Sequence, residues 1–270
     1  MRILLCNDDG IGAPGFRTLE AIARRLSKDV WVVAPELEQS GASHSLTLHR
    51  PLRVRRISRR RFAVNGTPTD CILLALNTLM KPSPPALVLS GVNRGMNAAD
   101  DVTYSGTVAA AMEATLLGVP AIALSQAYSG RVHWSTAETH APGLIRRLVA
   151  AGWPKGVLIN LNFPDATPAA VTGVEVVRQG RYMFGDAVTE RIDPRGRPYY
   201  WIGGERSDED QALRATERRP GTDLWALARG AIAVTAVALD LTHRPTQRRL
   251  ATRLLATRRL ATRRLATRRL

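Results

Sequence analysis

The chain has 270 residues, of which 45% are hydrophobic and 23% charged, which is typical of a globular protein and excludes a fibrous or disordered one for its bulk. Its net charge of +15 is concentrated at the end: residues 244–270 hold ten arginines and no acid, which leaves 28 basic and 23 acidic residues (+5) in 1–243. No apolar run reaches the roughly 20 residues that span a bilayer. The two early carboxylates argue against a signal peptide, and the two cysteines, Cys6 and Cys71, favour a reducing cytoplasm.

The first 164 residues alternate between short apolar runs and segments in which apolar residues recur at helical spacing. Such alternation predicts βαβ units, a parallel sheet and a doubly wound α/β fold. In chain order we expect the strand Arg2–Cys6, the helix Pro14–Leu26, the strand Val30–Ala34, a helix from Thr67 to about Met80, the strand Ala86–Ser90, the helix Ser105–Leu117, the strand Ala121–Ser125, the helix His140–Ala151 and the strand Val157–Asn162. Thr67 has the position of an N-cap, followed by Pro68. The arginine-rich segment Arg50–Arg61 is expected to form a solvated hairpin.

The composition changes after Pro164. Residues 165–222 are rich in Gly, Pro, Arg and Asp, with strand-like pieces at Val174–Arg178 and Tyr199–Gly203, and we expect an extended arm or hairpin subdomain there. Residues 223–243 contain a last apolar strand, Ala231–Leu241, which completes the fold. Because a long arm cannot bury itself, it favours packing on a second subunit, and hence a homo-oligomer.

The final 27 residues, 244–270, are dominated by a repeat of Ala-Thr-Arg-Arg-Leu. A step of five residues turns about 140° around a helix, so the repeated leucines scatter over all faces and form no apolar stripe. We expect a solvated, disordered tail. Weak, salt-sensitive contact with nucleic acid is its functional alternative.

Polar residues gather where several of the expected strands end. Asp8 and Asp9 follow the first strand, a serine-rich loop with Ser40 follows the second, and Asn93 follows the third. Loops at the carboxyl ends of parallel strands converge on one edge of the sheet. Two carboxylates, a hydroxyl and a carboxamide form an all-oxygen ligand set of the kind that Mg²⁺ and Mn²⁺ prefer. Each feature also has an ordinary explanation as a turn or loop.

A phosphate site is expected beside this ligand set. Ser105, Gly106 and Thr107 begin a helix, where free backbone N–H groups and the positive end of the helix dipole favour an anion. Asn93 is expected to contact the same phosphate, from a loop with Arg94 and Gly95 that closes over it. Ser105 can equally be a plain N-cap. A hard cation next to a phosphate cradle points to hydrolysis of a phosphoester by a metal-activated water, which Asp8 or Asp9 would orient or deprotonate. The sequence contains no P-loop motif.

Several motifs, in this order, resemble the SurE (survival protein) family of metal-dependent nucleotidases. They are Ile3 to Gly10 (ILLCNDDG), Val33-Ala34-Pro35 followed by Ser40 to Ser43, Gly66 to Cys71 (GTPTDC), Ser90 to Asn93 (SGVN), Tyr104 to Glu113 (YSGTVAAAME), Asn160 to Pro164 (NLNFP), Tyr200 to Gly203 (YWIG) and Gly221 to Asp223 (GTD). The resemblance covers about residues 1–242, and the arginine-rich tail has no counterpart in it.

The resemblance implies a Rossmann-like core, a protruding β-rich arm, and homodimers or homotetramers that exchange C-terminal elements. It places the metal ligands at Asp8, Asp9, Ser40 and Asn93. It also implies hydrolysis of nucleoside 5′- and 3′-monophosphates, with short polyphosphate as a further substrate. The alternative hypothesis is a non-catalytic nucleotide- or RNA-binding protein that uses the basic tail, although a pure binder needs no divalent-metal ligands.

Overall fold

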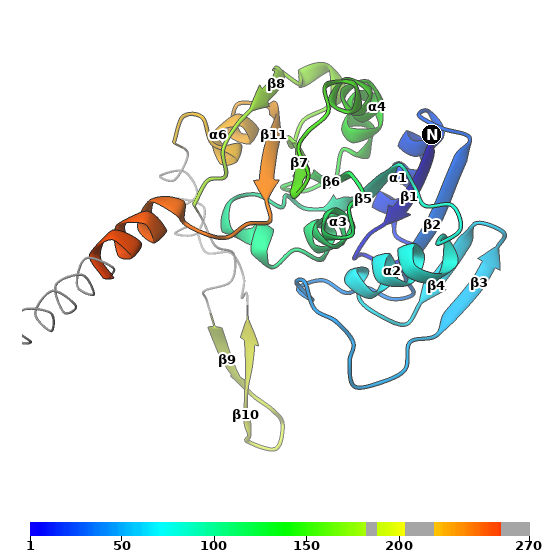
Figure 1. The fold of residues 1–270 in the computed structure, drawn as a ribbon. Coiled ribbons are helices and arrows are strands. Elements are labelled where there is room, and N and C mark those ends of the chain that lie inside the picture. Colours follow the sequence, from blue (N-terminus) through cyan, green and yellow to red (C-terminus); the bar gives the residue numbers. More distant parts are fainter. Residues whose placement is uncertain (182–187, 203–218, 255–270) are drawn as a thin grey trace, which may run out of the picture. The chain divides into compact units, whose positions relative to one another are not determined.

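The computed structural model describes residues 1–181, 188–202 and 219–254. Its centre is a nine-stranded sheet in the order β3-β4-β2-β1-β5-β6-β7-β11-β8 (Figure 1). The strands are β1 (Arg2–Cys6), β2 (Asp29–Pro35), β3 (Val54–Ser58), β4 (Arg61–Val64), β5 (Leu87–Arg94), β6 (Ala121–Gln126), β7 (Val157–Phe163), β8 (Gly173–Val176) and β11 (Ala231–Ala238). The pairs β2–β4, β1–β2, β1–β5, β5–β6, β6–β7 and β8–β11 are parallel, which confirms the doubly wound α/β fold.

Helices cover both faces of the sheet. They are α1 (Pro14–Arg24), α2 (Pro68–Leu74), α3 (Gly106–Leu116), α4 (Trp134–Ala151) and α6 (Asp223–Ala228), with short helical turns at Ala75–Leu79, Ala99–Thr103 and Pro168–Ala170. On one face, α1 packs against α4 over Ile3 and Leu5 of β1. On the other, α2 packs against α3, and Cys6 of β1 contacts the Pro68 carbonyl. No helix of the described residues is long and apolar enough to cross a membrane.

Strand β5 is longer than the sequence predicts, because it continues from Ser90 to Arg94. Its register on β6 shifts between Ser90 and Asn93. Gly91 permits this path: its φ is +129°, and a Cβ there would lie 2.2 Å from the carbonyl oxygen of Leu124. The expectation that Asn93 lies in a loop was therefore wrong, and the end of a strand holds it.

Helix α4 begins at Trp134, six residues before the predicted start at His140. Pro142 lies inside it and has no N–H to donate to the carbonyl of Glu138. Arg25 Nη1 donates to that carbonyl at 2.9 Å, which satisfies the acceptor and lets the helix continue through the proline.

The capped helix after Thr67 is confirmed. The Thr67 side chain accepts from the N–H of Asp70, and Asp70 accepts from the N–H of Thr67, so the two form a capping box.

The arginine-rich segment forms the expected hairpin, β3–β4, and this hairpin is the edge of the large sheet.

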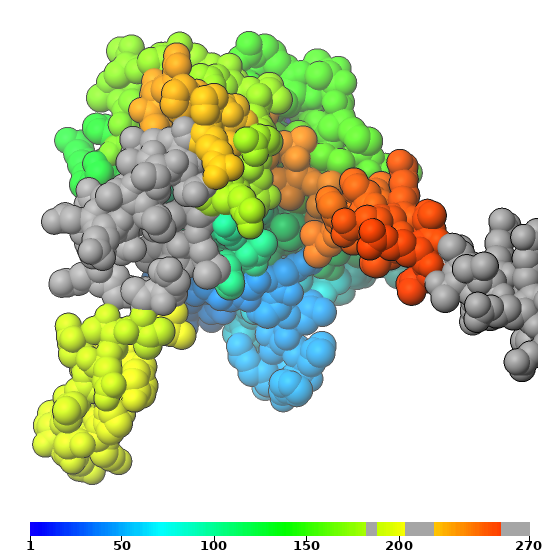
Figure 2. Space-filling model, turned by 90° about the vertical axis from the view of Figure 1, so that its left-hand side faces the viewer, coloured from blue at the N-terminus to red at the C-terminus, as the bar shows by residue number. Residues whose placement is uncertain are grey.

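Residues 173–180 and 219–234, far apart in the sequence, lie side by side (Figures 1 and 2). Strand β8 pairs with β11, and Val177 packs with Ala226 of α6. Thus β8, which follows the expected boundary at residue 164, is a strand of the large sheet. The division into residues 1–164, 165–222 and 223–243 stays a prediction.

Strands β9 (Val188–Ile192) and β10 (Pro198–Ile202) form a separate antiparallel hairpin. Of the second strand-like piece predicted from the sequence, Tyr199–Ile202 is strand and Gly203 lies outside the described residues. Both faces of β10 are exposed, including Trp201 at 62% and Ile202 at 80%.

Residues Ala238–Leu270 form a unit of their own. Residues 244–254 are helical, whereas the repeat leads us to expect disorder, and Arg244 pairs with Asp240 at 2.7 Å. Alanine, leucine and arginine are good helix formers even where no apolar face exists. Residues 255–270 of the tail lie outside the described residues.

Candidate active site

The predicted site residues meet at the carboxyl edge of the sheet, around a cavity of about 440 Å³. Asp8 and Asp9 come from the end of β1, Ser40 from the loop after β2, Asn93 from the end of β5, and Ser105 from the N-cap of α3; all five line this cavity. Strand β1 lies between β2 and β5, so the chain winds away from this point in both directions and leaves a crevice there.

Asp8 is almost fully buried, with 4% of its surface exposed. Burial raises the pKa of its carboxyl group above the usual value, against the lowering effect of a hydrogen bond that the Thr107 hydroxyl donates to Oδ1. The first turn of α3 lies directly against it, because a Cβ on Gly106 would come within 2.8 Å of the Asp8 Cβ.

Asp9 is less buried than Asp8 and forms the open side of the pair. Burial, and then the charge of Asp8, raise its pKa to about 6, although the N–H of Arg94 donates to Oδ2 at 3.3 Å. Neither carboxylate has a salt bridge within residues 1–181, 188–202 and 219–254. Two adjacent carboxylates, one buried and one partly buried, that form no salt bridge have the electrostatics of a cation site.

Two neutral oxygens complete the expected ligand set. The Ser40 hydroxyl donates to Glu38 Oε1 at 2.9 Å, which leaves the lone pairs of Oγ for a cation. Asn93 Nδ2 donates to the carbonyl of Gly95 at 3.0 Å, which leaves Oδ1 as the side-chain atom that would ligate a cation. The described residues include no cluster of three or more His, Cys, Asp or Glu side chains suited to a metal ion. A hard cation held by two carboxylates, neutral oxygens and water fits this donor set.

Ser105 is the N-cap of α3, since its Oγ accepts from the N–H of Val108 at 3.1 Å. That bond uses a lone pair and leaves the hydroxyl hydrogen able to reach a ligand in the cavity. Gly106 and Thr107 lie behind Asp8 and are not part of the cavity wall. Their expected role in binding phosphate stays a prediction, and the structure assigns Thr107 a contact to Asp8.

The sequence analysis named Arg94 only as part of a loop over the phosphate, and it missed Asn97. Arg94 lines the cavity with its guanidinium 4.9 Å from the centroid of the Tyr128 ring. Asn97 also lines the cavity. Two side chains of β7 fix its backbone: its N–H donates to Asn162 Oδ1 at 2.8 Å, and its carbonyl accepts from Asn160 Nδ2 at 2.8 Å. Two asparagines at i and i+2 of an otherwise apolar strand were the available clue to this support.

The family model described as "Survival protein SurE" matches residues 3–186. The chain belongs to the SurE family.

Relatives in the SurE family resemble it over most of their length. A protein named "5'-nucleotidase SurE" from Paramagnetospirillum magneticum is 58% identical over 252 residues, which covers 93% of this chain and 94% of that protein. A protein of the same name from Parvibaculum lavamentivorans is 56% identical and covers 93% and 90%. The crystal structure of the SurE protein from Aquifex aeolicus has a TM-score of 0.78 at 35% identity, over 93% of this chain and 99% of that one.

Proposed function

We propose that this SurE protein is a divalent-metal-dependent phosphatase that hydrolyses nucleoside 5′-monophosphates to nucleoside and phosphate. The observation that carries the proposal is the Asp8–Asp9 pair, of which Asp8 is buried and Asp9 partly buried, with no salt bridge among the described residues and facing a cavity at the start of α3. The relatives named 5′-nucleotidases support the choice of substrate. Activity on 3′-monophosphates and on short polyphosphate belongs to the same proposal, as an extension that shares the phosphoryl site.

Asp8, Asp9, Ser40 and Asn93 are the residues that would hold Mg²⁺ or Mn²⁺. When bound, the cation supplies positive charge against the phosphoryl oxygens and lowers the pKa of a water molecule. Thr107 fixes the orientation of Asp8 through its hydroxyl. Asp9 would orient the attacking water and take up its proton, because it is the more accessible of the two carboxylates.

The other side of the cavity would hold the phosphoryl group. The Ser105 hydroxyl at the start of α3 and the Arg94 guanidinium, which both line the cavity, would donate to its oxygens. These donors are stronger where water is excluded, and they would be aimed at charge that grows in the transition state.

The proposal is tested by measuring phosphate release from adenosine 5′-monophosphate with Mn²⁺, with Mg²⁺ and with a chelator. We expect turnover that the chelator abolishes and the cation restores, and loss of turnover in Asp8→Asn. A protein that binds the nucleotide but releases no phosphate under any of these conditions would support the alternative, a non-catalytic nucleotide-binding protein.

We also propose that the protein is a homo-oligomer in the cytoplasm. The hairpin β9–β10 supports the first part, because Val188, Ile192, Trp201 and Ile202 are all more than half exposed, and an isolated two-stranded hairpin is only marginally stable in water. A second copy of the chain would bury this apolar surface. The basic tail would add at most weak, salt-sensitive contact with nucleic acid.

A further inference from the structure

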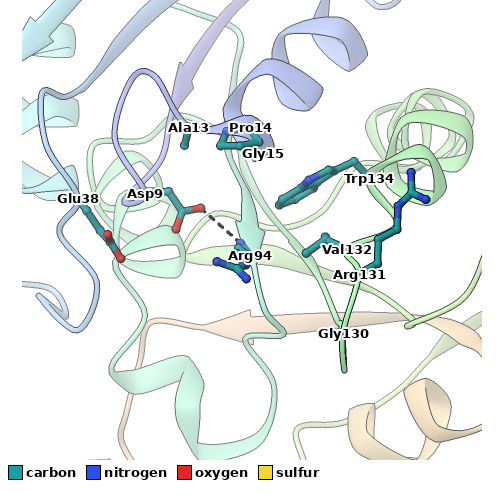
Figure 3. A pocket seen from close by; sticks show the side chains of 10 residues that line it. All are labelled: Asp9, Ala13, Pro14, Gly15, Glu38, Arg94, Gly130, Arg131, Val132 and Trp134. Atoms are coloured by element: carbon teal, nitrogen blue, oxygen red, sulfur yellow. Dashed lines mark hydrogen bonds between the residues drawn. The ribbon is translucent and has the colours of Figure 1, made fainter.

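A second cavity, of about 610 Å³, adjoins the first. Asp9, Glu38 and Arg94 line both cavities, so a ligand whose charged group occupies the first can extend into the second (Figure 3). Its remaining walls are the start of α1 and the segment between β6 and α4. The volume of each cavity is in the range of pockets that bind drug-sized molecules.

The largest side chain of the second cavity is Trp134, at the start of α4. Figure 3 shows its indole pointing toward Pro14 and Gly15, across the cavity from Asp9 and Glu38. Gly15 makes this position possible, because a Cβ there would lie 2.9 Å from two indole carbons and 2.0 Å from the carbonyl oxygen of Val92. The indole is only half-buried, so part of its apolar surface faces the cavity.

The lining favours a flat, uncharged group over a second phosphate. Ala13, Pro14, Val132 and Trp134 form an apolar wall. Two arginines, Arg94 and Arg131, line the second cavity. The guanidinium of Arg94 lies over the ring of Tyr128, which belongs to the first cavity. A single remaining arginine beside an indole is a poor site for a polyanion but a suitable stacking platform for an aromatic ring.

We infer that this second cavity takes the base of the nucleotide and that Trp134 is a specificity-determining residue, which distinguishes nucleotides from other phosphomonoesters. The inference rests on the proposed function, because the phosphoryl group must occupy the neighbouring cavity. Asp9 and Arg94, which line both cavities, lie where the phosphate joins the nucleoside.

The test compares two substrates that differ by the base alone, adenosine 5′-monophosphate and ribose 5-phosphate. We expect Trp134→Leu to lower kcat/KM for the nucleotide about tenfold more than for ribose 5-phosphate, mainly through KM, since stacking of one base contributes this much or more. Trp134→Phe, which keeps a smaller aromatic face, should restore part of the preference. Trp153→Leu is the matched control, because Trp153 is partly buried against the same core and does not line the cavity.

Two results would overturn the inference. One is an equal loss for both substrates in Trp134→Leu, or no loss for either. The other is a loss of base preference in Tyr104→Leu with Trp134→Leu unchanged, which would place the base against Tyr104 in the first cavity.

Failure of the proposed function would be recognised separately, because the wild-type protein would then release phosphate from neither substrate. In that case, calorimetric titration of the wild type and both variants with adenosine still tests whether the second cavity binds the base. Binding by the wild type and Trp153→Leu but not by Trp134→Leu supports the base site, and equal binding or none in all three overturns it.

Discussion

Replacement of Asp9 by asparagine is expected to make the metal-free protein more stable at neutral pH while it removes activity. Burial, and then the charge of Asp8, raise the pKa of Asp9 from 3.8 to about 6. A carboxyl group whose pKa is higher in the folded state binds its proton more tightly there than in the unfolded chain. The free energy of unfolding therefore falls as the pH rises from about 4 to 6, and the ionised Asp9 destabilises the fold above pH 6.

A pKa difference of this size corresponds to about 3 kcal/mol. That figure is an upper limit, because Asp9 is not fully buried and water screens part of its charge. Asparagine keeps an oxygen that can accept from the N–H of Arg94, now 3.3 Å from Asp9 Oδ2. We expect Asp9→Asn to raise the free energy of unfolding by about 1–3 kcal/mol at pH 7, with the gain shrinking toward zero near pH 4.

The measurement is urea denaturation in the presence of a chelator at several pH values between 4 and 7. Asp223→Asn is the matched control, since Asp223 accepts from the N–H groups of Ala99, Gly180 and Leu224 with both oxygens. Asparagine would leave one of these donors facing an NH₂ group, so this variant should lose stability at every pH. Equal destabilisation of Asp9→Asn at pH 4 and pH 7 would refute the electrostatic reasoning.

Three further outcomes are expected. Ser105→Ala should lower the stability by about 1 kcal/mol through loss of the cap, whereas Ser105→Gly should lower it by only a few tenths; both should reduce kcat/KM by about 10- to 100-fold if the hydroxyl donates to the phosphoryl group. Truncation after His243 removes ten arginines but no buried residue of the described part of the tail, so melting temperature and activity should be retained and low-salt binding to RNA should weaken. Trp201→Asp should shift the protein to a smaller species in sedimentation velocity, and an unchanged species would argue against the hairpin as the interface.

The elements predicted well from the sequence are those whose ends depend on local chemistry. Thr67 and Ser105 cap their helices as predicted, because a side-chain oxygen three residues before a free N–H needs no tertiary partner. Strand β1 is apolar from Ile3 to its last residue, Cys6, and polar residues follow directly, so the end of this strand was also predicted correctly. The convergence of Asp8, Ser40, Asn93 and Ser105 then followed from the parallel order of the strands.

The features that the sequence did not predict depend on contacts between distant residues. Helix α4 passes through Pro142, and Arg25, from another helix end, donates to the carbonyl that the proline leaves free. Strand β5 extends to Arg94 because Gly91 approaches the backbone of β6, and a local pattern cannot show such an approach. The second cavity was missed for the same reason, since Trp134 gains its position from Gly15 on another helix.

The position of Asp8 against α3 has a consequence for substrate binding. The positive end of α3 and the Thr107 hydroxyl both act on Asp8, yet burial still keeps its pKa raised, so the anionic charge there is not fully compensated. In the proposed function a phosphoryl group would use the same helix end and bring further negative charge beside Asp8 and Asp9. Neighbouring negative charges in a partly buried site repel each other strongly. A cation held by Asp8 and Asp9 would offset this negative charge, so the metal ion would be needed for the substrate to bind as well as for the phosphoester bond to break.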